Sequence, residues 1–231
     1  MVHAVLTIDD VSSANTPAIV DYLTEKGITA VMFAVGKNVE KFYDNAIYAL
    51  QKGMIIGNHS YSHPNFSEIT IEEGIEEIEH NERVLDKLYK DAGVERKYRP
   101  FRFPYGNKGD KNKPALQKYL RDHGFSKLKD TQIPFAFWKE FGLDREIDTL
   151  WTFDFCEYLI RPQFKFTKES VFKRMDDMHP ESLNPLFEEG GSHILLIHAH
   201  DETEEYVPGY FRLFIDHLLE KGVVVDKPEF I

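Results

Sequence analysis

The sequence predicts an α/β fold, a single distorted or incomplete (β/α) barrel of about seven units that spans residues 1–231. Three observations support this prediction. Short apolar segments alternate with helical segments, which indicates parallel strands joined by helical crossovers. No obvious linker divides the chain. Of the 231 residues, 42% are hydrophobic, which is enough to build one substantial core.

The strands are predicted from short apolar runs that end at polar residues. The first run, "HAVLTI", is rich in β-branched and apolar residues and ends at two adjacent acids, as expected for a buried strand that delivers carboxylates. The expected strands, in chain order, are 3–8, 29–35, 54–57, 100–103, 148–153 and 193–198.

The helices are predicted from apolar spacing and from end signals. The first has Pro17 in its first turn and Gly27 as its stop. The third has the clearest signals, because Thr70 and Glu73 form a capping-box pattern and isoleucines and leucines follow at helical spacing. The expected helices are 15–27, 38–53, 70–89, 114–124, 168–178 and 209–222.

One segment, 127–146, fits neither the helical nor the strand period. It carries four large aromatic residues, Phe135, Phe137, Trp138 and Phe141. Two interpretations stay open: an excursion over the site, in which Trp138 would contact the substrate, and a loop packed on the core.

Charge and composition limit the partners and the chemistry. The 39 acidic residues exceed the 28 basic ones, giving a net charge of -11, so neither nucleic acid nor an anionic membrane is an expected partner. The one cysteine, Cys156, rules out an intramolecular disulfide and a thiolate zinc cluster. A metal site would therefore use histidines and carboxylates.

The N-terminus "MVHAVLTIDD" has no basic and apolar leader, and no run of residues is long enough to span a membrane. A cytoplasmic location is expected if the chain is complete. An extracellular or periplasmic location is expected if a targeting segment has been removed.

Polar residues follow the predicted strands repeatedly. In a parallel barrel the strand ends meet at one face, so these residues are candidates for a common site. Asp10, His59 and His63 would form a set of two histidines and one carboxylate, which suits a divalent transition metal and leaves positions for water. The strand-end residues are Asp9, Asp10, His59, His63, Arg102 to Gly106, Asp154, Glu157 and His198.

Each of these features also has a structural explanation. Ten histidines make a pair at this spacing unremarkable by itself, and Pro64 argues against a helix through His63. Adjacent aspartates after a strand are common in turns, and Asp9 and Asp10 share a site only if the strand curls at its end. His198 could be a hydrogen-bonded core residue. The recurrence of polar residues at five strand ends favours a site.

Taken in order, these segments resemble the motifs of the NodB-type polysaccharide deacetylases, carbohydrate esterase family 4. The family motif TFDDG appears as "TIDDV", H(S/T)xxH as "HSYSH", RxPYG as "RFPYG", D(S/T)xDW as "DFCEY" and LxH as "LIH". The resemblance covers most of the chain, from about Val5 to beyond His200.

The resemblance implies a role for each matching residue. Asp9 would be the catalytic base and Arg102 would hold it in place. The Tyr105 backbone amide would face the oxyanion. His198 would be the general acid, with its pKa raised by Glu157.

The resemblance also implies the ligands of one divalent metal ion and the walls of the substrate groove. The metal is expected to be zinc, with cobalt, nickel or manganese as alternatives. Its ligands would be Asp10, His59 and His63. Pro104, Tyr105 and Tyr158 would contact the substrate.

The chain departs from the family motifs at three places. Val11 replaces a glycine, Phe155 replaces a small hydroxyl residue, and Glu157-Tyr158 replaces Asp-Trp. None of these removes a metal ligand or the base, but they put the shape of the substrate groove in question. His200 and Asp201, which follow His198, could lie near the site, but a loop role is the favoured expectation.

The expected function is removal of acetyl groups from an N- or O-acetylated carbohydrate of the chitooligosaccharide, peptidoglycan or acetylxylan type. The alternatives are hydrolysis of a non-sugar linear or cyclic amide and a catalytically silent carbohydrate-binding homologue. The sequence does not choose among these substrates and gives no oligomeric state.

Overall fold

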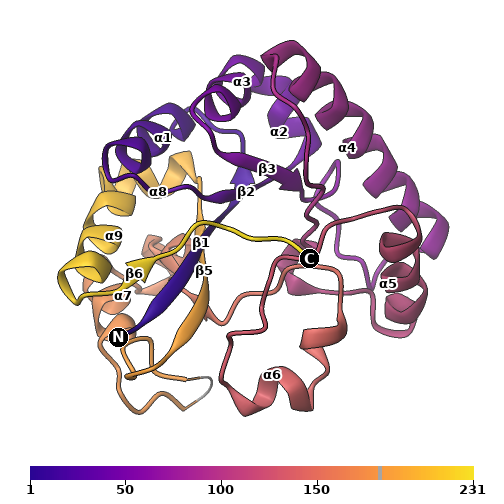
Figure 1. Cartoon of the computed structure of the whole chain (residues 1–231). Helices are drawn as coiled ribbons and strands as arrows, with labels where there is room; N and C mark the ends of the chain where they lie inside the picture. Colours follow the sequence, from indigo (N-terminus) through magenta and orange to yellow (C-terminus); the bar gives the residue numbers. More distant parts are fainter. Residues whose placement is uncertain (182–183) are drawn as a thin grey trace.

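The structure, a computed structural model, describes residues 1–181 and 184–231 and has the predicted α/β architecture (Figure 1). Its strands form one parallel sheet in the order β3-β2-β1-β5-β4, with β6 paired to the start of β1. The strands are β1 (His3–Val11), β2 (Val31–Ala34), β3 (Ile55–Asn58), β4 (Phe153–Asp154), β5 (Ser192–His198) and β6 (Val224–Val225).

The central strand β1 is buried on both faces, which accounts for its nearly continuous apolar sequence. Ile8 pairs with Met32 of β2 on one side and with Ile197 of β5 on the other. This register brings the carboxyl ends of β1 and β5 side by side, with Asp9 opposite His198.

The helices lie around the sheet (Figure 1). The longest, α4, has the predicted capping box between Thr70 and Glu73 and ends at Gly93 in the left-handed conformation. The helices are α1 (Thr16–Glu25), α2 (Gly36–Lys41), α3 (Tyr43–Gln51), α4 (Ile71–Ala92), α5 (Lys113–Asp122), α6 (Ala136–Glu140), α7 (Lys168–Met175), α8 (Asp201–Tyr206) and α9 (Tyr210–Glu220).

The predicted regular alternation fails between β3 and β4, so the count of about seven units is wrong. The expected strand at 100–103 is only a single bridge, between Phe101 and Asn58, and the expected strand at 148–153 shortens to β4. The Thr149 N–H donates to the Phe101 carbonyl across this gap. The barrel is therefore incomplete, as expected, with irregular backbone where further strands would close it.

The aromatic segment 127–146 packs on the core. Phe135 and Trp138 are buried beneath the sheet with Val5, Phe33 and Ile194. Burying a tryptophan requires a partner for its indole N–H, and Asp130 accepts that hydrogen bond at 2.8 Å. Of the two interpretations of this segment, the structure therefore shows the packed loop.

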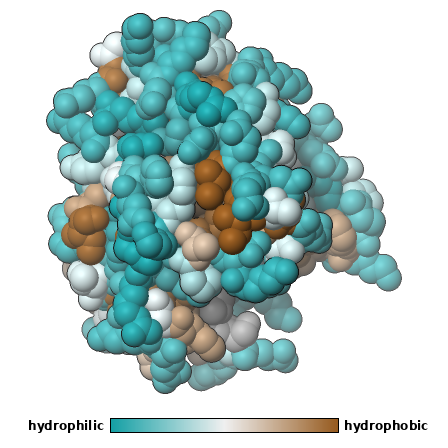
Figure 2. All heavy atoms as spheres, turned by 90° about the vertical axis from the view of Figure 1, so that its right-hand side faces the viewer, coloured by the Kyte–Doolittle hydropathy of each residue, from teal (hydrophilic) through white to brown (hydrophobic). Residues whose placement is uncertain are grey.

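The face of the molecule on the right of Figure 1 is mostly hydrophilic, with a small group of hydrophobic residues near its centre (Figure 2). Among the described residues, none of the helices combines the length and the hydrophobicity needed to cross a membrane.

Candidate active site

The carboxyl ends of the strands enclose a cavity of about 240 Å³ that gathers most of the predicted site residues. Its lining comes from β1, from the loops after β3 and β4, from the turn after Phe103 and from the end of β5. The lining residues are Asp9, Asp10, His59, His63, Tyr105, Trp151, Asp154, Tyr158, Leu196, His198 and His200.

A distortion at the end of β1 lets two adjacent aspartates reach the same cavity. The register of β1 against β2 shifts between Ile8 and Val11, and Asp10 adopts a φ of 62°. Neighbouring residues of a regular strand point to opposite faces, so a bulge of this kind is needed to bring both carboxylates to one site. Left-handed backbone at a non-glycine residue costs energy and is often retained at functional sites.

His59 and His63 lie in the loop that follows β3, and neither is in a helix. The His59 Nδ1–H donates to the Arg102 carbonyl at 2.8 Å, which leaves the Nε2 lone pair directed at the cavity. The His63 N–H donates to the Ser60 hydroxyl, and His63 itself has a φ of 60°. The ring of His59 and the backbone of His63 are therefore held in place.

Buried polar residues of α4 support this loop from below. The Asn81 amide donates to the Asn58 side chain at 2.9 Å, and the Asn58 amide donates to Glu82 at 2.9 Å. The Asn58 oxygen in turn accepts from the Ser60 N–H. The amphipathic helix α4 thus makes buried polar contacts with Asn58, where the histidine loop begins.

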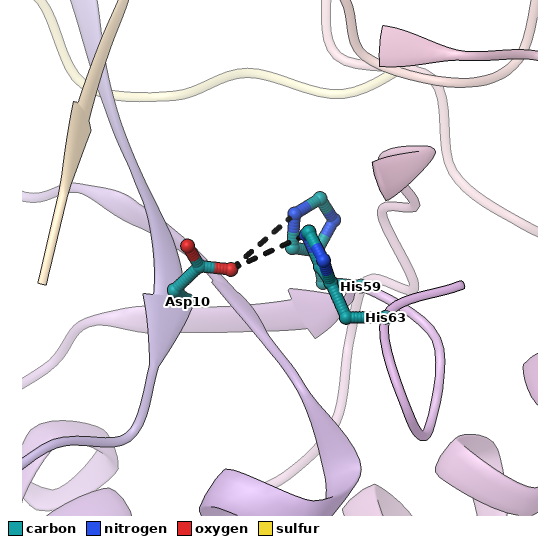
Figure 3. Close-up of side chains that lie close together, drawn as sticks. All are labelled: Asp10, His59 and His63. Carbon is teal, nitrogen blue, oxygen red and sulfur yellow. Dashed lines mark ion pairs between the residues drawn. The ribbon is translucent and has the colours of Figure 1, made fainter. Parts of the chain in front are cut away.

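Asp10, His59 and His63 converge on one point (Figure 3). The Asp10 Oδ1 lies 3.4 Å from His63 Nε2 and 3.9 Å from His59 Nε2. Burial lowers the pKa of His63 to about 4, so its ring is neutral at pH 7. Burial alone would raise the pKa of Asp10, but the hydrogen bond from His200 and the neighbouring histidines hold it well below its usual range. An ionised carboxylate and a neutral imidazole are the forms that bind metal, so this set fits a divalent ion.

Asp9 is held by a buried arginine. The Arg102 Nη1 donates to Asp9 Oδ1 at 2.7 Å and to the Thr7 hydroxyl at 2.8 Å, and the Arg102 Nε donates to the Thr149 carbonyl. The second carboxylate oxygen, Asp9 Oδ2, lies 3.4 Å from His59 Nε2. Asp9 therefore has one oxygen fixed by the arginine and the other beside the candidate metal site.

Tyr105 occupies the short 3₁₀ turn Pro104–Gly106 with a φ of 58°. Its side chain is largely exposed, and its ring contacts His63 edge to face at 4.6 Å between centroids. Within the described residues, no hydrogen-bond partner for the Tyr105 N–H is found. That donor is available to a ligand in the cavity.

His198 and Glu157 form the opposite wall. The Glu157 Oε1 lies 3.0 Å from His198 Nδ1 and also accepts the His198 backbone N–H. Burial would lower the pKa of His198, but the Glu157 carboxylate outweighs it and raises that pKa to about 10. The predicted direction of the shift is therefore found, and His198 keeps a proton at neutral pH.

Two residues predicted to contact the substrate do not line the cavity. Trp138 is buried beneath the sheet and does not line the cavity, because its ring fills the second core cluster. Pro104 is the buried first residue of the turn that presents Tyr105, and it is likewise absent from the lining. Tyr158 lines the cavity, as predicted, with its ring edge to face against His198.

Three lining residues, Trp151, Leu196 and His200, are not among the predicted site residues. His200 donates from Nε2 to Asp10 Oδ2 at 2.6 Å, although the sequence favoured a loop role. Its position two residues after His198 was the available signal, since alternate residues at a strand end share a face. Trp151 also lines the cavity, and it lies three residues before Asp154 in a stretch expected to be strand.

A family model described as polysaccharide deacetylase matches residues 2–127, which is more than half of the 231 residues. The chain belongs to the polysaccharide deacetylase family. The matched region contains Asp9, Asp10, His59, His63 and Arg102.

Two curated relatives of this chain are named as deacetylases. A peptidoglycan-N-acetylglucosamine deacetylase of Bacillus cereus is 37% identical over 102 residues, covering 44% of this chain and 35% of the relative. A chitin deacetylase of Amylomyces rouxii is 32% identical over 106 residues, covering 46% of this chain and 24% of the relative. The chain thus matches about a third or less of the length of these relatives.

Among solved structures, a family 4 carbohydrate esterase from Streptomyces lividans in complex with acetate superposes with a TM-score of 0.63. The match has 18% sequence identity and covers 96% of this chain and 91% of that one. At this identity the likeness concerns the fold, a distorted barrel.

The departures of this chain from the family motifs fall in two places. Val11 and Phe155 are fully buried in the main core and lie outside the cavity lining. Glu157 is buried against His198, and Tyr158 lines the cavity. Of the three departures, the Glu157-Tyr158 pair is therefore the one that changes the wall of the site.

Proposed function

We propose that this protein is a metal-dependent deacetylase that hydrolyses acetyl groups on an N-acetylated glycan. The observation that carries the proposal is the common cavity in which Asp10, His59 and His63 lie between Asp9 on one side and His198 on the other. Zinc is the first candidate for the metal, because two imidazoles and one carboxylate suit it and leave positions for water and substrate.

When bound, the metal would polarise the acetyl carbonyl and make water a stronger acid. The protein's own residues would carry the remaining steps. Asp9, fixed by Arg102 through Oδ1, would take a proton from the attacking water on Oδ2. The Tyr105 N–H would donate to the carbonyl oxygen as negative charge develops there.

His198 would complete the reaction as the acid. Its Nδ1 is engaged by Glu157, so Nε2 is the atom available to give a proton to the departing sugar amine. The water oxygen ends on the acyl carbon and the C–N bond breaks, giving acetate and a free amino sugar. The raised pKa of His198 keeps its ring protonated at neutral pH, as an acid for the leaving amine requires.

The substrate class is proposed from the substrates named for the relatives and from the residues that line the cavity. The two named relatives act on peptidoglycan N-acetylglucosamine and on chitin, which both carry N-acetyl groups. Tyr105, Trp151 and Tyr158 give the cavity aromatic walls suited to packing against a sugar ring. We therefore propose an N-acetylated glycan, and not acetylxylan, as the substrate.

The catalytically silent homologue is the second candidate, and the non-sugar amide hydrolase the third. Both groups needed for proton transfer are present and each has its buried partner, which supports the enzyme over the silent homologue. The test is acetate release by the purified protein from chitooligosaccharides, peptidoglycan fragments and acetylxylan, each with and without chelator. We expect chelator-sensitive release from an N-acetylated glycan. No release from any of the three, with metal bound, would overturn the proposal.

A further inference from the structure

The carboxylate of Asp10 is contacted differently at its two oxygens. Oδ1 faces the imidazoles of His59 and His63, whereas Oδ2 lies 2.6 Å from Nε2 of His200. A carboxylate that binds a metal through one oxygen still rotates unless its other oxygen is held. His200 supplies that second contact from a residue 190 positions away in the sequence.

The tautomer of His200 follows from its surroundings. The Nδ1 atom is buried and has no hydrogen-bond partner among the described residues. A lone pair without a partner costs less than a buried N–H without one, and a carboxylate accepts hydrogen bonds only. A ring that carries a proton on Nε2 meets these conditions, so His200 donates to Asp10.

The backbone of His200 is fixed on both sides. The His200 N–H donates to the Tyr210 hydroxyl at 3.2 Å, and the same hydroxyl donates to the His198 carbonyl. The next residue, Asp201, accepts from the Asn15 N–H at 2.9 Å and so ties the start of α8 to the start of α1. The His200 ring also stacks on His198 at 5.0 Å between centroids. The ring is therefore preorganised to meet Asp10.

From these contacts we infer that His200 is a positioning residue of the metal site, which fixes Asp10 through Oδ2 so that Oδ1 alone faces the metal. The inference rests on the proposed metal site. The backbone of Asp10 is itself constrained, in the left-handed conformation at the end of β1. Outer hydrogen bonds of this kind commonly change metal affinity by roughly 10–100-fold.

The test measures the dissociation constant of Zn²⁺ in competition with a chromogenic chelator. His200→Phe keeps a planar ring but removes the donor. His200→Gln places an amide N–H near the former Nε2. His217→Phe is the control, because His217 makes a similar Nε2 contact, at 2.9 Å, to the surface residue Asp176. Far-ultraviolet circular dichroism checks that each variant is folded.

We expect His200→Phe to bind Zn²⁺ about 10–100-fold more weakly than the parent, with His200→Gln within about threefold and His217→Phe unchanged. Parent-like binding by folded His200→Phe would overturn the inference. Binding by His200→Gln as weak as that of His200→Phe would also overturn it, because the imidazole itself would then be required. Failure of the parent to bind Zn²⁺ would instead contradict the proposed metal site.

Discussion

The Arg102 Nη1 donates to Asp9 Oδ1 at 2.7 Å, and both side chains are almost completely buried. An ion pair removed from water is stabilising only while it stays paired, since either partner left alone is a buried charge. The Arg102 Nη1 also donates to the Thr7 hydroxyl, and its Nε donates to the Thr149 carbonyl. The position of Asp9 therefore depends on Arg102.

Replacing Arg102 with methionine should lower the free energy of unfolding by about 3–5 kcal/mol, because Asp9 is left as an unpaired buried carboxylate. Urea denaturation of the metal-free protein measures the change. The control is Arg83→Met, which breaks the exposed 2.7 Å pair with Glu76 and should have little effect. Equal, small changes for both variants would contradict the role given to Arg102.

Replacing His59 with alanine should reduce metal affinity by more than the roughly 10–100-fold expected for an outer residue, because a direct ligand is lost. The loss of affinity is measured as the metal content of the variant after dialysis. His193→Ala is the matched control, since His193 is also buried but lies at the opposite end of β5 from His198. Undiminished metal content in His59→Ala would refute the ligand assignment.

Replacing Asp9 with asparagine should retain the metal and reduce the rate of acetate release by roughly 10²–10⁴-fold, because the base is removed but Asp10, His59 and His63 remain. Asp10→Asn provides the contrast, as it should lose the metal itself. Zinc content and turnover measured on the same samples separate the two effects. Full activity in Asp9→Asn would eliminate the proposed base.

Replacing Glu157 with glutamine should move the alkaline limb of the pH–rate profile to lower pH by at least about one unit. In the parent, Glu157 raises the pKa of His198 to about 10, against the opposing effect of burial, so the acid keeps its proton through neutral pH. Without the Glu157 carboxylate, only the charges of Asp10 and Asp9 still oppose the effect of burial, so that pKa should fall. An unchanged alkaline limb would show that His198 is not the acid.

The contact between Glu157 and His198 should also affect the free energy of unfolding of the metal-free protein. A histidine whose folded pKa is raised stabilises the fold fully below its unfolded pKa, near 6.5, and loses that contribution as pH rises toward about 10. The difference in unfolding free energy between the parent and Glu157→Gln should therefore shrink from pH 6 to pH 10.

Features set by local sequence were predictable. The capping box of Thr70 and Glu73 begins α4 because both partners lie within one turn. Apolar runs located β1, β2, β3 and β5, and the order of polar strand ends located Asp9, Asp10, His59, His63 and His198.

Features that depend on distant contacts were not predictable. Residues 100–103 have a strand-like composition, but the chain there makes one bridge to Asn58, so tertiary hydrogen bonding overrides propensity. Trp138 belongs to the core because Asp130 satisfies its indole, which sequence spacing does not reveal. His200 meets Asp10 only through the pairing of β1 with β5.

The central claim is that catalysis runs at one metal site formed by Asp10, His59 and His63. Its most direct test removes the metal from the protein and measures acetate release from an N-acetylated glycan as Zn²⁺ is added back. We predict almost no release without metal and full recovery at one equivalent of Zn²⁺ per chain. A rate that is unaffected by removal of the metal would contradict the account.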